Sequence, residues 1–471
     1  MKHFSPSLRW ALAGWLAAVA CVSPLQAQSL VADLNPPSER GMASFEVWAN
    51  QRSNALSSGF LNTFQAGGFL SRAFFEEALA AHPLVGGMGV QAGWAKRGST
   101  RPLGEGPWAV TGSVGSEVLV STLWRRDLFE LAFLGNAGHV GRVDVFSGTG
   151  MRVGAFNRLS LGMEHVETRQ RMELSVVQRV AGVEWGIPNG SFWVSEGVDS
   201  MEVNMQAYGL ASLDRFPDTS GVQFNHVLPA YGVGISGSLP LTSDLFPLQF
   251  LVDFQDVGVM WEPAGGLVAA VDTGFVTSGL RVPFSSYFTE GGGDSEDGIT
   301  WQDIVDGTTG IEPDSLYFVS DSALGRMLML PTKIHAQLSW WPTPDLQVRA
   351  QARAGSWMPE PEITVGVGWL PTKRLAFGLD YRTGGWGGAR PVTWLDLRVT
   401  KKRMLSIEVD DPLGWMWGSE QAANTYGRGV RISLKRLPGA GWTRFMGLPS
   451  RDLRGPAPVK QTQLPQTSSR P

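Results

Sequence analysis

The chain has 471 residues, with 39 basic and 43 acidic side chains, and only 17% of its residues are charged. This balance offers no basic surface, so we exclude nucleic-acid binding and expect no nucleic-acid partner. Low charge combined with 58 glycines and 19 tryptophans favours a β-barrel in lipid, although a large secreted β-protein could share this composition.

The N-terminus has the three-part layout of a secretory signal peptide. Lys2 and Arg9 precede an apolar stretch over residues 10–22, and Ala27 is a small residue at a suitable cleavage point. Removing residues 1–27 leaves 37 basic against 43 acidic side chains, a net charge of −6. No later stretch approaches the roughly 18–20 apolar residues of a transmembrane helix, so we expect an exported chain without a helical anchor.

Cys21 is the only cysteine, and it lies within this signal peptide. Its removal would exclude disulfides and thiol chemistry from the mature chain. The alternative is a lipoprotein acylated at Cys21, but Ala18 stands where such a motif prefers leucine.

Residues 28–107 are predicted to form a lead-in that contains a short helix and the first strand or strands. A strand is expected at residues 43–48. Leu70, Phe74 and Ala78 have helical spacing, which predicts a helix over residues 70–82. We expect this helix in the periplasm or inside the barrel.

From Trp108 onward the sequence predicts strands in quick succession. The segments Ser116–Trp124 and Leu128–Leu134 predict a hairpin around a turn at residues 125–127. Further strands are expected at residues 157–165, 171–180, 182–187, 191–194, 201–208, 231–239 and 248–261.

The strand pattern stops over residues 263–329, which predicts one long acidic loop. No lysine or arginine occurs between Arg281 and Arg326, and the acidic residues gather in residues 290–314. Loops of this length are usually functional or mobile, and barrels place their long loops outside the cell. Calcium binding is a second interpretation, but the spacing of the carboxylates does not match that of a calcium hand, which favours a solvated loop.

Alternation returns at Lys333 and continues to residue 435. Between Glu362 and Leu370, for example, isoleucine, valine and tryptophan fall on one face, and threonine and glycine fall on the other. The turns between these strands are tight, at residues 342–345, 371–373 and 400–402. The tail over residues 438–471 is rich in proline, glutamine and serine and is predicted to be disordered.

These features predict an all-β fold, a transmembrane antiparallel β-barrel of about 14 strands over residues 108–437, with short periplasmic turns and one long outer loop. An exported chain without a spanning helix can enter a membrane only as a closed barrel. A water-soluble sandwich would also explain the alternation, but so many strands would need two domains. No linker between two domains is visible in residues 108–437.

Several segments resemble a family of uncharacterised outer-membrane β-barrel proteins of Gram-negative bacteria. They are Asn35–Pro37, Phe254–Trp261, the acidic insertion after Ser286, the run from Leu330 to Leu370, and Asp410–Trp415. The family is distantly similar to long-chain fatty-acid transporter barrels. The resemblance implies location in the outer membrane, with lipid and the barrel-assembly machinery as partners. One departure is that the last strand ends on Leu434 and Lys435, where such barrels usually end on an aromatic residue.

The motifs of common enzymes are missing, so we expect no catalytic residues, no metal site and no cofactor. Neither a zinc-protease motif, nor a serine-hydrolase elbow, nor a phosphate-binding loop occurs. His335 lies on the polar face of its strand, where a hydrogen-bonded lumen residue is a simpler interpretation than a base. The C-terminal tryptophans could stack on sugars, but an interface girdle needs fewer assumptions. They are Trp340, Trp341, Trp357, Trp369, Trp386, Trp394, Trp415 and Trp417.

Charged residues of both signs occupy the predicted lumen face and are the candidate functional residues. Charged side chains in this position could select, by charge, which molecules enter the lumen. We therefore expect passage or binding of a small, amphipathic molecule. The alternative is a non-transporting scaffold that docks an envelope or secretion partner through its outer loop or tail. The lumen-lining candidates are Arg349, Arg353, Asp380, Asp396, Arg398, Glu408 and Arg431.

Overall fold

The computed structural model describes residues 43–436, except for 67–70, 103–105, 166–167, 199, 213–227, 243–247, 279–315, 320–324, 344, 373, 401–402 and 413–424. The expected signal peptide, the acidic residues 290–314 and the tail 438–471 lie outside the described residues. Within the described part, no helix is both long and apolar enough to cross a membrane.

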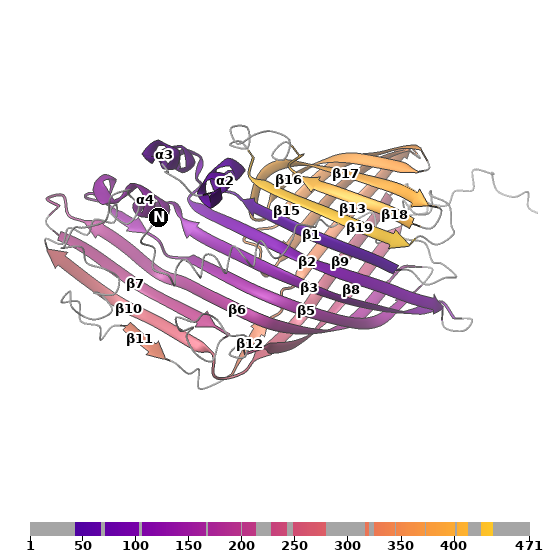
Figure 1. The fold of residues 1–471 in the computed structure, drawn as a ribbon, viewed down its shortest axis with the longest axis horizontal. Helices are drawn as coiled ribbons and strands as arrows, with labels where there is room; N and C mark the ends of the chain where they lie inside the picture. Colours follow the sequence, from indigo (N-terminus) through magenta and orange to yellow (C-terminus); the bar gives the residue numbers. More distant parts are fainter. Residues whose placement is uncertain are drawn as a thin grey trace, which may run out of the picture.

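Fourteen antiparallel strands form a closed wall, which confirms the predicted barrel and its strand number (Figure 1). The first strand pairs with the second on one side and with the last on the other, so the ring of strands has no free edge. The wall consists, in spatial order, of β1 (Ala43–Ser53), β2 (Val85–Pro102), β3 (Trp108–Arg125), β5 (Thr149–His165), β6 (Arg171–Val194), β8 (Ala230–Thr242), β9 (Leu248–Glu262), β13 (Lys333–Thr343), β14 (Leu346–Gly355), β15 (Glu362–Thr372), β16 (Leu375–Gly384), β17 (Gly387–Thr400), β18 (Arg403–Asp410) and β19 (Gly427–Arg436).

The polarity of the wall is inverted relative to a water-soluble protein. On β15, Ile363 and Val365 are 52% and 53% exposed, whereas the intervening Thr364 is 2% exposed. A soluble sandwich would bury the apolar face of its strands and expose the polar one. The opposite arrangement here is that of a barrel with an outward apolar band, so the sandwich alternative is excluded.

The two ends of the barrel differ. The turn end carries tight connections such as those between β13 and β14, β15 and β16, and β17 and β18, as the sequence predicts. The long segment 263–329 leaves β9 at the opposite, loop end. Its described part is not a plain loop, because it contains β10 (Leu267–Ser278), β11 (Leu316–Val319) and β12 (Arg326–Met329). β10 pairs with a strand outside the fourteen-strand ring, where no lipid face imposes strict alternation.

The barrel begins before Trp108, because β1 and β2 are full members of the wall. Between them lie α2 (Ser58–Ala66) and α3 (Arg72–Ala81). α3 confirms the predicted helix, but it lies at one end of the barrel and not inside it (Figure 1). β1 enters the wall at the turn end and leaves it at the loop end, so the helices lie at the loop end (Figure 1).

The hairpin predicted around residues 125–127 is wrong, because residues 126–134 form helix α4 (Arg126–Leu134). Asp127 in the first turn suits the positive end of the helix dipole. Gly135 ends the helix with a φ of +81°, which glycine adopts without strain. The apolar side chains of α4 pack in two directions, against α2 and α3 and against β6 and β7 (Ser200–Ala211).

β6 is the longest strand, with 24 residues, and the sheet branches along it. Its first part pairs with β8 as far as Arg179, and its second part pairs with β7 from Val183 onward. β7, β10 and β11 therefore continue the sheet beyond the wall at the loop end (Figure 1). The three segments predicted separately over residues 171–194 are one strand.

Candidate functional site in the barrel lumen

Period-2 alternation directs the candidate residues into the lumen, where they are closely paired. Arg349 on β14 reaches Asp380 on β16 with two hydrogen bonds, donated by Nε to Oδ1 over 3.1 Å and by Nη2 to Oδ2 over 2.5 Å. Its guanidinium carbon also lies 4.7 Å from the ring centroid of Trp394 on β17. Bidentate pairing and cation–π contact together fix Arg349 in one position.

Glu362, at the start of β15, is the centre of a larger network. Its Oε2 accepts hydrogen bonds from Arg390 over 2.7 Å and from Arg52 over 3.0 Å. Its Oε1 lies 3.5 Å from Arg353 and 3.6 Å from Arg382. Four guanidiniums from β1, β14, β16 and β17 thus converge on one carboxylate.

Two further carboxylates on β18 complete this network. Asp410 accepts hydrogen bonds from Arg52 and from Arg382, and Glu408 accepts one from Arg382 over 3.0 Å. Four guanidiniums therefore face three carboxylates, a formal excess of one positive charge. We call these seven residues the arginine network: Arg52, Arg353, Arg382, Arg390, Glu362, Glu408 and Asp410.

The remaining candidates lie nearer the turn end or in separate pairs. Arg431 on β19 donates to Glu46 on β1 over 3.1 Å. Asp396 on β17 is buried opposite Ser406 in the strand register, and Arg398 lies half-buried near the turn to β18. The structure thus joins Arg353 and Glu408 in one network, pairs Arg349 with Asp380, and places Arg431 opposite Glu408 in the register of β18 and β19.

Five members of the arginine network are not among the lumen-lining candidates: Arg52, Glu362, Arg382, Arg390 and Asp410. Arg52 is 358 residues away from Asp410, and only barrel closure brings them together. A partial local signal for Arg52 was present, because it follows Glu46, Trp48 and Asn50 at alternate positions along β1, with valine and alanine between the first three.

An apolar cluster lines the lumen on the strands across from the arginine network. Its buried members include Leu119 on β3, Phe156 on β5, Val177 on β6 and Leu330, which precedes β13. Trp357, in the turn between β14 and β15, meets Phe156 edge to face with ring centroids 5.6 Å apart. This turn therefore reaches across the lumen from one side of the wall to the other.

A second set of ion pairs lies beside the apolar cluster. Glu117 on β3 accepts a hydrogen bond from Lys333 on β13 and lies 3.7 Å from Arg158 on β5. Arg158 also contacts Asp256, which is fully buried in β9 and has a φ of +52°. The apolar cluster is thus enclosed by charged groups on both sides.

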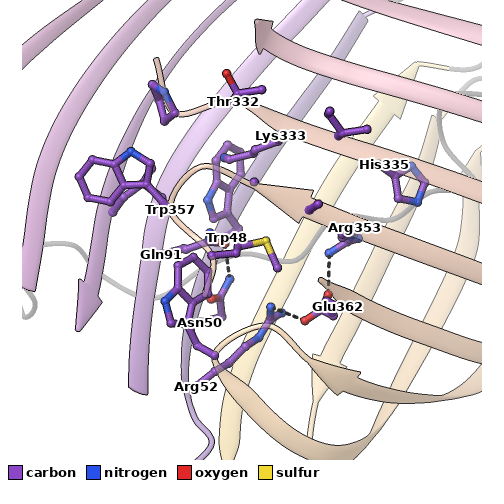
Figure 2. Close-up of a pocket in the computed structure, with 17 residues that line it drawn as sticks. Trp48, Asn50, Arg52, Gln91, Thr332, Lys333, His335, Arg353, Trp357 and Glu362 are labelled. Carbon is purple, nitrogen blue, oxygen red and sulfur yellow. Dashed lines mark hydrogen bonds and ion pairs between the residues drawn. The ribbon is translucent and has the colours of Figure 1, made fainter. Parts of the chain in front are cut away.

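A cavity of about 70 Å³ separates the arginine network from the apolar cluster. Figure 2 shows Arg52 and Arg353 both directed at Glu362 on one side, with Trp357 on the other. Trp48, His335 and Trp386 also line it. The cavity has one charged wall and one aromatic wall, and its volume holds a few water molecules at most.

Side chains fill most of the lumen around this cavity. A water-filled channel would leave inward side chains accessible, yet Arg349, Asp380, Asp396, Glu408 and Arg431 are each 4% exposed or less. The interpretation of all C-terminal tryptophans as an interface girdle is also wrong in part. Trp340 and Trp369 do face outward. Trp341, Trp357, Trp386 and Trp394 do not, and Trp415 and Trp417 lie outside the described residues.

The structure is similar to several solved channel and transporter structures. A TodX deltaS2S3 mutant monoaromatic hydrocarbon channel is 8% identical, with 86% of this chain and 91% of that chain covered and a TM-score of 0.37. A FadL homologue of Pseudomonas aeruginosa is 8% identical, with 87% of this chain and 94% of that chain covered and a TM-score of 0.36. The Pseudomonas putida toluene transporter TodX is 7% identical, with 88% of this chain and 93% of that chain covered and a TM-score of 0.30. No protein-family model and no curated protein matches the chain.

Proposed function

We propose that the protein is an outer-membrane barrel that binds a small amphipathic molecule in its lumen and lets it pass. Lipid surrounds the wall, and the barrel-assembly machinery inserts it. The observation that carries this proposal is the cavity, whose charged wall would hold a polar head and whose aromatic wall would hold an apolar body. Ligand sites commonly combine an apolar lining with a few placed polar groups. The formal excess of one positive charge in the arginine network favours an anionic head.

The test is equilibrium binding and proteoliposome uptake of octanesulfonate, with octyltrimethylammonium as a cationic probe of similar size. We expect the anionic probe to bind more tightly. Arg353→Gln should weaken its binding roughly tenfold or more, since a hydrogen bond to a charged group contributes about 1.5–3 kcal/mol. Trp357→Ala should weaken the binding of both probes, because it removes the apolar wall.

Arg374→Gln is the matched control, because it makes the same charge change at an exposed position in the turn between β15 and β16. Its binding and uptake should equal those of the wild type. Absence of binding and uptake for both probes in the folded wild-type barrel would refute the proposal.

The filled lumen also favours a second candidate function, a scaffold that transports nothing. In that case the barrel would conduct no ions and take up neither probe, while deletion of residues 290–314 or 438–471 would abolish binding of an envelope partner. Uptake that depends on Arg353 would exclude this alternative.

A further inference from the structure

Trp386 crosses the mouth of the barrel from the turn between β16 and β17. It is 1% exposed, and its indole N–H donates to Ser121 Oγ on β3 over 2.9 Å. Its ring lies against Gly89 on β2, where a Cβ atom would come within 2.2 Å of the ring. One side chain thus connects the β16–β17 hairpin to the opposite part of the wall.

The backbone around Trp386 is rich in glycine, since two glycines precede it and two follow it. Gly384 and Gly385 have φ values of +84° and +72°, which other residues adopt only with strain. Within the described residues, the register between β17 and β18 ends at Val392, and the tip of the hairpin has no described strand partner on that side. A buried tryptophan on such a tip can leave its site without breaking the barrel's strand ladder.

Passage of a solute requires such a movement, because the cavity holds only a few water molecules. The strands that form its walls are fixed by continuous backbone pairing. Trp386 lines the cavity and belongs to a turn at the loop end. Trp386 itself is not paired in the strand ladder, which ends at the pair formed by Gly384 and Gly387, so it combines closure of the site with a position in a turn.

We propose that Trp386 is the access gate of the cavity: it closes the lumen at the loop end and swings out to admit a solute. This proposal rests on the proposed function. The Ser121 hydrogen bond and the recess at Gly89 hold the gate shut.

The first test compares Trp386→Ala with Trp394→Ala in proteoliposome uptake of octanesulfonate. Both changes remove an inward indole of the same size, but Trp394 lies within β17 and is not on the hairpin tip. We expect several-fold faster uptake for Trp386→Ala and no such increase for Trp394→Ala. Ser121→Ala removes only the hydrogen bond and should give a smaller increase in the uptake rate. This variant tests the gate even if Trp386→Ala does not fold. Heat-modifiable migration in gels verifies that each variant folds.

The second test locks the gate with a disulfide. A Cβ atom on Gly388 would lie 3.5 Å from Tyr426 Cβ, within the range of about 3.5–4.5 Å that disulfides require. Gly388→Cys with Tyr426→Cys, in a chain that also carries Cys21→Ser, has no other cysteine. Oxidation should reduce uptake to that of protein-free vesicles, and dithiothreitol should restore it.

The gate would be refuted if Trp386→Ala and Trp394→Ala took up the probe at equal rates, or if the oxidised pair matched the reduced one. In either case, uptake by the wild type that still depends on Arg353 would leave the proposed function intact. Failure of the wild type to bind or take up the probe would refute the proposed function itself.

Discussion

Glu362 is the side chain on which the stability of the arginine network depends. It is 1% exposed and faces Arg52, Arg353, Arg382 and Arg390. Buried charges are costly unless they are paired, and removing one partner leaves the others uncompensated. The arginine network is therefore cooperative, and its stability depends on the one carboxylate that all four guanidiniums share.

Replacing Glu362 with glutamine should lower the free energy of unfolding by about 3–5 kcal/mol, the usual effect of breaking a buried ion pair. Urea titration of the barrel in lipid vesicles measures this. The control is Glu360→Gln, an exposed position two residues away, which should change little. Adding Arg390→Gln to Glu362→Gln should recover part of the loss. An additive second loss would show that the two side chains do not act as a pair.

His82 predicts a pH dependence at the loop end, outside the wall. Its Nε2 accepts a hydrogen bond from the Trp124 indole over 2.6 Å, and its Nδ1 lies 2.6 Å from the Pro83 carbonyl. Burial is the main cause that lowers the pKa of His82 below its ordinary value of 6.5; the hydrogen bond to Pro83 opposes this shift, and Arg126 adds to it. The unfolded segment thus binds a proton more readily than the folded one, so stability is lost as the pH falls below about 6.5.

Limited proteolysis of the helices at the loop end between pH 7.5 and pH 5 should therefore become faster at the acidic end. His82→Gln keeps an acceptor for Trp124 but does not titrate, so its proteolysis rate should not change with pH. The same pH dependence in this variant would assign the effect to another group.

At the scale of elements, α2, α3 and α4 form a small unit with a core of its own. Phe129 is 5% exposed and lies with its ring centroid 6.1 Å from Phe60 and 4.7 Å from Phe133. Phe129→Ala should destabilise this unit by about 3–5 kcal/mol, since it leaves a cavity among packed rings. Native-state proteolysis should detect the loss, while the barrel remains heat-modifiable.

Phe64→Ala is the control for this prediction, because Phe64 lies on α2 but is 45% exposed. Its effect should be much smaller. Simultaneous loss of the folded barrel in Phe129→Ala would show that the helices and the wall unfold together.

The strands were predictable from the sequence because each wall strand has lipid on one face and the lumen on the other, which imposes alternation. The segment around Val365 is an example, and its two faces are as different in the structure as in the sequence. α4 was missed because Arg125–Asp127 resembles a turn between two apolar segments. The helical spacing of Leu128 and Leu131 matters only once α4 packs against β6 and β7.

The candidate site was predictable only in part. Alternation placed Arg349 and Arg353 correctly on the inward face, but it carries no information about which partner lies opposite. That depends on ring closure, which brings Arg52 on β1 to Asp410 on β18. Trp386 was assigned to the interface because nothing local indicates that its turn folds into the mouth of the barrel.

At the scale of the whole molecule, the outward apolar band should require lipid. Val367 lies at the middle of β15 and is 46% exposed. Val367→Arg should cost about 2–4 kcal/mol in a bilayer, the usual effect of a charge near the midplane. Equilibrium unfolding in phospholipid vesicles tests this, with Val367→Leu as the control. An unchanged stability would mean that this part of the wall does not face lipid.

The inverted polarity of the wall also determines how the sequence can diverge. An outward position such as Val365 has only lipid for a neighbour, so any apolar residue should serve, independently of changes elsewhere. An inward position such as Asp380 is tied to a particular partner, and its replacement becomes tolerable only together with a change at Arg349. Two mutational regimes therefore alternate along each strand, free drift on one face and paired substitution on the other. Among related sequences, residues that change together should therefore lie almost entirely at lumen positions.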